Sequence, residues 1–228
     1  MINDAIVQIL QRNQFENCRN PGGHAGGKMV WRYHSVLGQK GNLEIDLNYM
    51  YRQPLFEPQA LSPAFDQYAH LSFPVLDIHE LVAGKLSAMF SRLASRDIFD
   101  AHQLLTRVSF DADKLRFAFV TYMAMTGLKV EQITVDSINP NLQEFHDRLL
   151  PVLRRSALKT SLALSDWVAG MVVELRQALS QVLPLHENEA VFIRHVECNG
   201  QIHPELITQD EGASKYFEAT PRAAMVGC

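Results

Sequence analysis

The stretch Val75–Leu105 constrains the fold of this chain more than any other segment. The end of an apolar strand leads into a segment with helical apolar spacing, and a second helical segment follows after a short turn. The first helix carries the cations Lys85 and Arg92, and the turn after it reads Arg96-Asp97-Ile98-Phe99-Asp100. Basic residues on one helix and acids opening the next suit a protein that handles phosphates and a divalent cation.

The spacing of apolar residues is almost wholly helical from residue 77 onward. Strands are expected only before residue 77. The expected helices cover residues 1–16, 77–94, 97–108, 111–126, 141–154, 161–183 and 187–198, and the expected strands cover residues 28–37, 42–51 and 70–76. The sequence therefore predicts an α+β fold, with a small sheet followed by a helical bundle. We expect two domains, residues 1–106 and 107–228.

Composition excludes several classes of protein. With 47% hydrophobic and 20% charged residues and a net charge of −4, the chain has no global basic field for nucleic acid or membranes. An RNA substrate would need a local basic patch. The three cysteines, Cys18, Cys198 and Cys228, form no CxxC pair and indicate reduced thiols. No apolar run is long enough to span a bilayer and no signal peptide is evident, so we expect a cytoplasmic protein without membrane contact.

Two interpretations of the helix from residue 77 remain open. On an ideal helix, Lys85 lies at the edge of the apolar stripe, and Arg92 lies near the same line about 10 Å further along. Glu80 and Ser87 are expected on the opposite, solvated side. Both cations could extend their charged ends into water. Alternatively, the two cations lie along the same side of the helix and bind a triphosphate. Lys85 would then act as a point charge, and the planar guanidinium of Arg92 would make a bidentate contact.

The acids that follow also allow two interpretations. Asp97 and Asp100 lie near a helix start, where a capping role stabilises the helix and is expected for one of them. Because they are three residues apart, they share a face, and Arg96 precedes them. They could therefore hold Lys85 or Arg92 in place by ion pairing.

The segment 42–49 alternates apolar and polar residues, with Glu44, Asp46 and Asn48 on one face of a strand. Such a face is usually solvated. Alternatively, the carboxylate of Asp46 supplies oxygen ligands to Mg²⁺.

Two other patterns are weaker. The segment Gly22–Met29 resembles a P-loop, but Met29 replaces the hydroxyl residue and a strand follows instead of a helix, so we reject it. A modest basic run is expected to form a solvated face or a nucleic-acid contact: Arg148, Arg154, Arg155 and Lys159.

Together these segments resemble the AbiEii/AbiGii toxin family, nucleotidyltransferase-like proteins of bacterial abortive-infection and toxin–antitoxin systems. The resemblance covers Trp31–Leu105 and, in general character, the helical remainder. It includes the family's strand carboxylate, matched by Asp46, and its signature of Lys followed by Arg-Asp-x-x-Asp, matched by Glu80, Lys85, Arg92, Arg96-Asp97 and Asp100.

Membership implies a nucleotidyltransferase-like region, transfer of a nucleotide from an NTP to an acceptor such as tRNA, Mg²⁺ and a cognate antitoxin. Asp46 would be a metal-side or base carboxylate. Lys85 would contact the triphosphate, and Asp97 would complete the site. Four further residues would support the site: Glu44, Arg92, Arg96 and Asp100.

The chain departs from the family in one respect. The family's first motif, a Gly-Ser or Gly-Gly turn followed by an Asp-x-Asp pair, has no counterpart here. Two-metal catalysis needs several carboxylates around paired cations. We therefore expect the 1–106 domain to be a truncated nucleotidyltransferase-like domain, inactive or weak alone. Missing first strands would also expose a sheet edge through which copies could associate.

Two further functions remain open. The chain could be a non-catalytic remnant that binds RNA, nucleotide or a protein partner through its helical surface. It could also be a small-molecule nucleotidyltransferase of the kind that modifies aminoglycosides.

Overall fold

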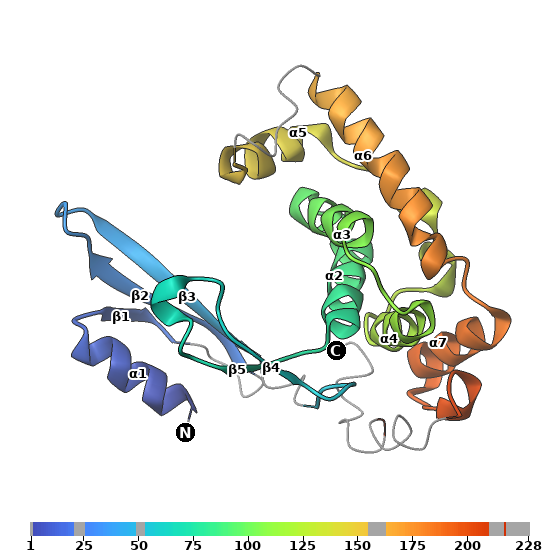
Figure 1. The fold of residues 1–228 in the computed structure, drawn as a ribbon, viewed down its shortest axis with the longest axis horizontal. Coiled ribbons are helices and arrows are strands. Elements are labelled where there is room, and N and C mark those ends of the chain that lie inside the picture. Colours follow the sequence, from blue (N-terminus) through green and yellow to red (C-terminus); the bar gives the residue numbers. More distant parts are fainter. Residues whose placement is uncertain (1, 21–25, 49–52, 155–162, 210–216, 218–228) are drawn as a thin grey trace. The chain divides into compact units, whose positions relative to one another are not determined.

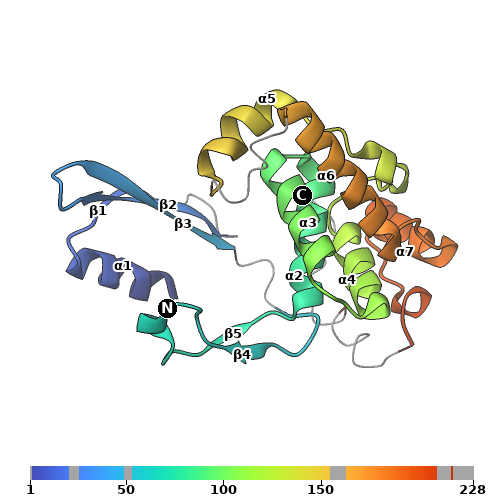
Figure 2. The ribbon, with the colours of Figure 1, turned by 45° about the horizontal axis from the view of Figure 1, so that its top comes forward.

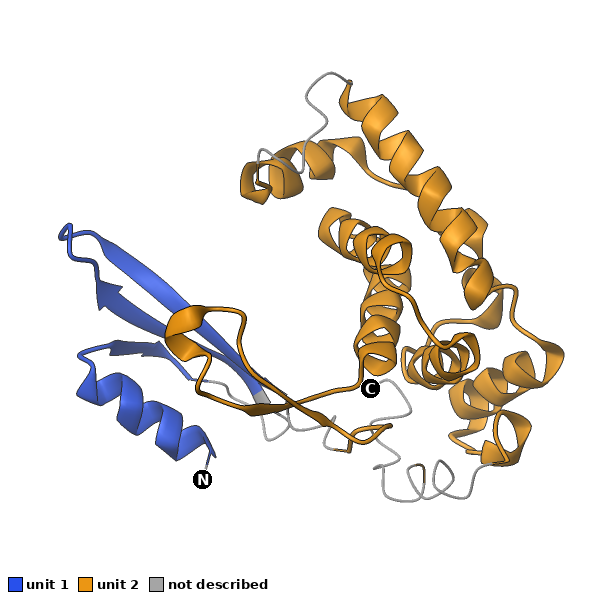
Figure 3. Ribbon diagram, in the orientation of Figure 1, with its two compact units in different colours: residues 1–52 blue, residues 53–228 orange. Residues whose placement is uncertain are grey.

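The fold is α+β, as predicted, with a small antiparallel sheet followed by helices (Figure 1). The computed structural model describes residues 2–20, 26–48, 53–154, 163–209 and 217. Contacts divide the chain into two compact units, residues 1–52 and 53–228 (Figure 3). The division into domains near residue 106 stays a prediction.

Unit 1 consists of one helix and a three-stranded antiparallel sheet in the order β1-β2-β3. Its elements are α1 Ile2–Arg12, β1 Glu16–Arg19, β2 Gly26–His34 and β3 Lys40–Asn48. The buried core consists of Leu10 from α1 with Met29 and Trp31 from β2, so the helix covers one face of the sheet.

The alternation predicted for β3 is confirmed over residues 44–47, whereas Leu43 on the predicted apolar face is exposed. Ile45 and Leu47 pack against the core of unit 1, whereas Glu44 and Asp46 are exposed. The side chain of Asn48 lies outside the described residues.

Strand β1 was not predicted, because the first helix was expected to continue to Glu16. The helix ends at Arg12, and Gln14 adopts a φ of +62°, a left-handed conformation that stops a helix. The chain then reverses, and Glu16–Arg19 pairs with β2.

The hairpin turn also lies earlier than expected. Ser35 Oγ accepts hydrogen bonds from the backbone N–H groups of Leu37 and Gln39, and Gly38 adopts a φ of +79°. Glycine tolerates this conformation without steric cost. Leu37 is therefore an exposed turn residue and not, as the sequence pattern predicts, the end of a strand.

Unit 2 begins with a two-stranded antiparallel ribbon and continues as helices (Figure 2). The ribbon pairs β4 Gln59–Leu61 with β5 Phe73–Val75, and a 3-10 turn, Asp66–Tyr68, lies between them. The longer helices are α2 Ile78–Arg92, α3 Ser95–Arg107, α4 Ala112–Ala124, α6 Leu164–Ala178 and α7 Glu187–Asn199. In the described part of the chain, no helix has the length and apolar character needed to cross a membrane.

Helix α2 is central to unit 2, because it packs against both α3 and α4. Helix α3 in turn contacts α6, and α4 contacts α7. The core between them is fully buried at Leu86, Met89 and Phe119. A short link joins α2 to α3, in which Leu93 adopts a φ of +49° at the end of α2. The link places the end of α2 beside the start of α3.

The helix expected over residues 141–154 is broken into short pieces. They are α5 Leu142–Glu144, a π-helical turn Phe145–Leu149 and a 3-10 turn Leu150–Val152. Pro151 lacks a backbone N–H and cannot continue the helical hydrogen bonds. The helix expected over residues 161–183 is also shorter than expected. Helix α6 ends at Ala178, and a 3-10 turn, Leu179–Gln181, follows it.

Of the predicted basic run, Arg148 and Arg154 are exposed, as expected of a solvated face. Arg155 and Lys159 lie outside the described residues, as does Cys228. Cys18 and Cys198 carry free thiols.

Candidate functional site

The corner between α2 and α3 brings together four of the residues singled out from the sequence. Lys85 Nζ lies 2.8 Å from Asp100 Oδ2. Arg92 donates to both oxygens of Asp97, and its Nη2 lies 2.9 Å from Oδ1. The two cations of α2 are thus each paired with an acid of α3, and Arg92 makes the bidentate contact that its planar fork allows.

The two pairs differ in burial. The side chain of Asp97 is 3% exposed while that of Arg92 is 52% exposed, so a buried carboxylate orients a guanidinium that reaches solvent. The hydrogen bonds that Arg92 donates to Asp97 raise the pKa of Arg92. Lys85 and Asp100 are both about half exposed.

Asp97 lies in the first turn of α3, as expected of an acid that favours the helix dipole, but neither acid caps the helix by a side-chain hydrogen bond. The residue before α3 is Ala94, and no side chain caps the helix there. The carboxylate oxygens of Asp97 bind Arg92 instead, because the guanidinium of α2 lies within reach. Arg96 is exposed in the first turn of α3.

The remaining predicted site residues, Asp46 and Glu44, lie on β3 in unit 1. Both are exposed, and Glu44 Oε2 accepts a hydrogen bond of 2.8 Å from Lys28 Nζ. This hydrogen bond lowers the pKa of Glu44. The proximity of Asp46 to Lys85 stays a prediction.

The metal implied by the sequence resemblance is not matched by a preformed cage. Over residues 2–20, 26–48, 53–154 and 163–209, no group of three or more His, Cys, Asp or Glu side chains is placed to hold a metal ion. Two-metal chemistry requires such a cluster. The described carboxylates alone do not fit it.

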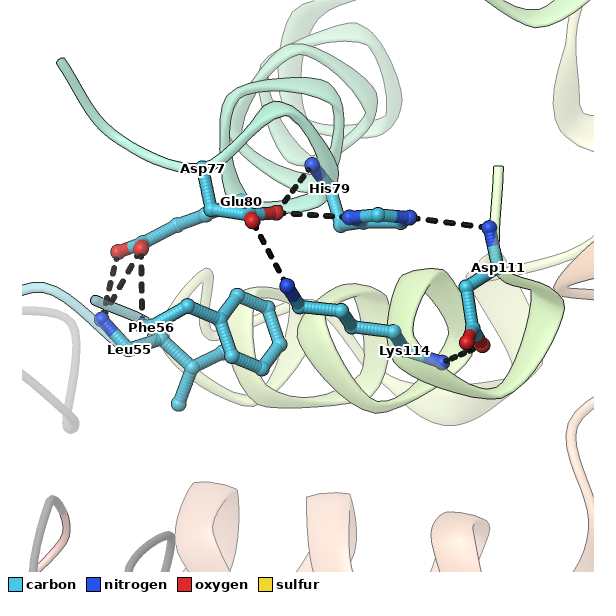
Figure 4. A network of polar contacts seen from close by, with 7 residues as sticks. All are labelled: Leu55, Phe56, Asp77, His79, Glu80, Asp111 and Lys114. Atoms are coloured by element: carbon cyan, nitrogen blue, oxygen red, sulfur yellow. Dashed lines mark hydrogen bonds and ion pairs between the residues drawn. The ribbon is translucent and has the colours of Figure 1, made fainter. Parts of the chain in front are cut away.

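Glu80 corrects one expectation from the sequence, because it is buried and not solvated. Its residue exposure is 1%. Figure 4 shows its hydrogen bonds with Leu55 and Phe56. The carboxylate accepts hydrogen bonds from the backbone N–H groups of Leu55, at 3.0 Å, and Phe56, at 3.3 Å, and from the hydroxyl of Tyr122, at 2.9 Å. Glu80 therefore anchors the segment before β4 to α2 and α4.

Small residues explain why this face of α2 is buried. Glu80 is followed at helical spacing by Ala83, Gly84 and Ser87, which are too small to keep a neighbouring helix at a distance. A Cβ atom on Gly84 would lie 3.4 Å from the ring of Tyr122, so α4 approaches closely there. This stripe of small residues is the signal that sequence reasoning missed.

A second polar network fixes the start of α2 (Figure 4). Asp77 caps the helix by accepting from the backbone N–H of His79, and its Oδ1 lies 2.7 Å from His79 Nδ1. The other ring nitrogen of His79 accepts from the backbone N–H of Asp111 at 3.0 Å. Lys114 Nζ binds Asp77 Oδ2 at 2.7 Å. Asp77 thus joins α2 to α4.

The network predicts a pH dependence of stability. Burial raises the pKa of Asp77, but hydrogen bonds from Lys114 and His79 outweigh it, and the net pKa is lowered. Because the folded state holds the ionised form, its stabilisation is complete above the unfolded pKa of about 3.9 and is lost as the pH falls through the lower folded value.

We expect Asp77→Asn to reduce the free energy of unfolding at pH 6, and the difference from wild type to shrink between pH 5 and pH 3. Urea unfolding at several pH values measures this. A difference that stays constant down to pH 3 would contradict the role of the Asp77 charge.

Comparison with known proteins identifies the chain. Residues 2–186 match the family described as nucleotidyl transferase AbiEii toxin, type IV toxin–antitoxin system. The chain belongs to the AbiEii family. The match spans β3, the α2–α3 corner and most of the helical region, and it confirms the resemblance found in the sequence.

A solved structure supports the fold of this AbiEii protein. MenT4, a nucleotidyltransferase toxin from Mycobacterium tuberculosis H37Rv, is similar with a TM-score of 0.50 and 16% sequence identity. The similarity covers 98% of this chain and 74% of the MenT4 chain. No curated protein matches the chain.

Proposed function

We propose that this AbiEii protein binds the triphosphate of an NTP at the α2–α3 corner and supports transfer of a nucleotide to an RNA acceptor such as tRNA. The main support is that the family signature converges at this corner as two ion pairs whose cations remain half exposed. Lys and Arg at such a position can donate to phosphate oxygens while their acids keep them oriented.

The four paired residues have different roles in this proposal. Asp97 fixes the plane of Arg92, so one edge of the guanidinium is oriented before a nucleotide arrives. Lys85 is less tightly held, because an exposed ion pair such as Lys85–Asp100 is worth about 0–1 kcal/mol. A phosphate oxygen can therefore replace Asp100 as the partner of Lys85. Arg96 adds positive charge nearby.

Asp46 is proposed as the strand carboxylate that faces a divalent cation, Mg²⁺ by family resemblance, with Glu44 in support. The 228 residues contain no Gly-Gly turn followed by an Asp-x-Asp pair on a strand, so the other acidic ligands are missing from the proposed site. We therefore propose that this polypeptide binds NTP but transfers nucleotides weakly. A cognate antitoxin, a cytoplasmic location and homo-oligomers through a sheet edge stay predictions.

One alternative has a specific observation in its favour. The lack of a carboxylate cluster among the described residues also suits a non-catalytic protein that binds nucleotide or RNA. An aminoglycoside-type acceptor has no comparable support.

Incubation with labelled NTPs, Mg²⁺ and total RNA tests the proposal. We expect labelling of RNA that is weak and is lost in Lys85→Ala. Robust labelling by this polypeptide would contradict the proposed impairment. Nucleotide binding with no labelling at all would favour the non-catalytic alternative, and labelling of an added aminoglycoside instead of RNA would identify the other acceptor class.

A further inference from the structure

A groove lies between α3 and α6, both in unit 2, and has a volume of about 340 Å³. This is at the lower end of the range for small-molecule sites, enough for one nucleobase but not for a whole NTP. Gly170 of α6 lines the groove, and a Cβ atom added there would meet no other atom within 4 Å. The groove is therefore open at Gly170.

Aromatic side chains form one wall. Phe99 of α3 and Trp167 of α6 both line the groove, with ring centroids 6.3 Å apart. Phe145 contacts Trp167 edge-on, also at 6.3 Å. Trp167 thus contacts two other rings and is only partly buried. Unpaired bases of single-stranded RNA commonly stack on such aromatic side chains.

Polar groups line the rest of the groove in a fixed arrangement. Gln103 Nε2 lies 2.9 Å from His102 Nδ1, and His102 Nε2 lies 2.8 Å from Glu174 Oε2. If the amide donates to Nδ1, the other ring nitrogen donates to Glu174, so the chain orients that carboxylate. Asp166 supplies a second carboxylate to the groove. Carboxylates accept hydrogen bonds from the exocyclic amine of a base such as cytosine.

We propose that this groove binds one unpaired base of a single-stranded RNA, and that the base carries an exocyclic amine. The inference rests on the proposed role of RNA as the acceptor and adds the place where the acceptor is recognised. The base would stack on Trp167 and donate its amine to Asp166 or Glu174.

The charge distribution favours a base over a phosphate inside the groove. Two carboxylates repel a triphosphate, whereas a base is neutral. Arg107 lies at the groove and can contact the RNA backbone. Asp100, Gln103 and Arg107 share one face of α3 at helical spacing, so this face leads from the groove toward the Lys85–Asp100 pair.

The fluorescence of Trp167 reports directly on occupation of the groove. Trp31 is 1% exposed in unit 1, so quenching by added RNA is assigned to Trp167. The titrants are the hexanucleotides rC6, rA6 and rU6 without NTP, because uracil lacks the amine. The blocking variant is Gly170→Leu, which adds a bulky side chain to the lining of the groove. Its matched control is Gly170→Ala, which leaves the groove open. Both replace a mid-helix glycine by a better helix former, so both should fold.

We expect rC6 and rA6 to quench wild type and Gly170→Ala alike, rU6 to bind about tenfold more weakly, and Gly170→Leu to lose at least tenfold in affinity for rC6. NTP binding by Gly170→Leu should equal wild type, which separates this inference from the proposed NTP site. Equal affinity of all three proteins for rC6 would overturn the proposal, and so would equal affinity of the wild-type protein for rU6 and rC6.

Discussion

Replacing Glu80 by alanine is expected to lower the free energy of unfolding by about 3 kcal/mol or more, because several buried hydrogen-bond donors lose the same acceptor. The substitution leaves the backbone N–H groups of Leu55 and Phe56 and the hydroxyl of Tyr122 without their acceptor. Each buried donor left unsatisfied costs about 1–3 kcal/mol. Urea unfolding at pH 7 measures the loss.

Two controls make this prediction specific. Tyr122→Phe removes one of the hydrogen bonds to Glu80 and should cost about 1 kcal/mol. Glu131→Ala removes an exposed carboxylate, 69% exposed and paired with Arg194, and should change the free energy of unfolding very little, because solvent screens such a pair. If Glu80→Ala were no more destabilising than Glu131→Ala, the carboxylate would not anchor the start of unit 2 as described.

Helical periodicity predicted the order and type of most elements. Helices α2, α3, α4 and α7 lie within a few residues of their expected bounds. The errors occur where a single residue determines the local backbone conformation. Gln14 takes a left-handed conformation that local pattern does not reveal, and Pro151 breaks a segment that otherwise reads as one helix.

Part of the candidate site could also be predicted from the sequence spacing of its charged residues. Because Asp97 and Asp100 follow the cations after a short turn, ion pairing with Lys85 and Arg92 could be expected, and both pairs form. The burial of Glu80 was harder to predict from the sequence. A glutamate on a helix is normally solvated, and the small residues that follow Glu80 do not by themselves show that distant backbone donors and a tyrosine satisfy its buried carboxylate. The groove between α3 and α6 depends on tertiary packing that no local pattern encodes.

Lys85→Ala is expected to weaken NTP binding about ten- to a hundredfold. A hydrogen bond from a charged donor is worth about 1.5–3 kcal/mol, which corresponds to this range of affinity. The effect on stability should be below about 1 kcal/mol, because the pair with Asp100 is half exposed. The two effects therefore separate, and a loss of binding cannot be attributed to unfolding. Lys85→Arg keeps the positive charge and should retain part of the affinity.

Isothermal titration of each of the four NTPs, with Mg²⁺, into wild type, Lys85→Ala and Arg194→Ala is the most direct measurement. Arg194 is the matched control, because its side chain is 51% exposed and is paired with a carboxylate on another helical segment. The account predicts that Lys85→Ala alone loses at least tenfold in affinity. Equal affinity of Lys85→Ala and wild type for every NTP would contradict the claim that the α2–α3 corner binds the triphosphate.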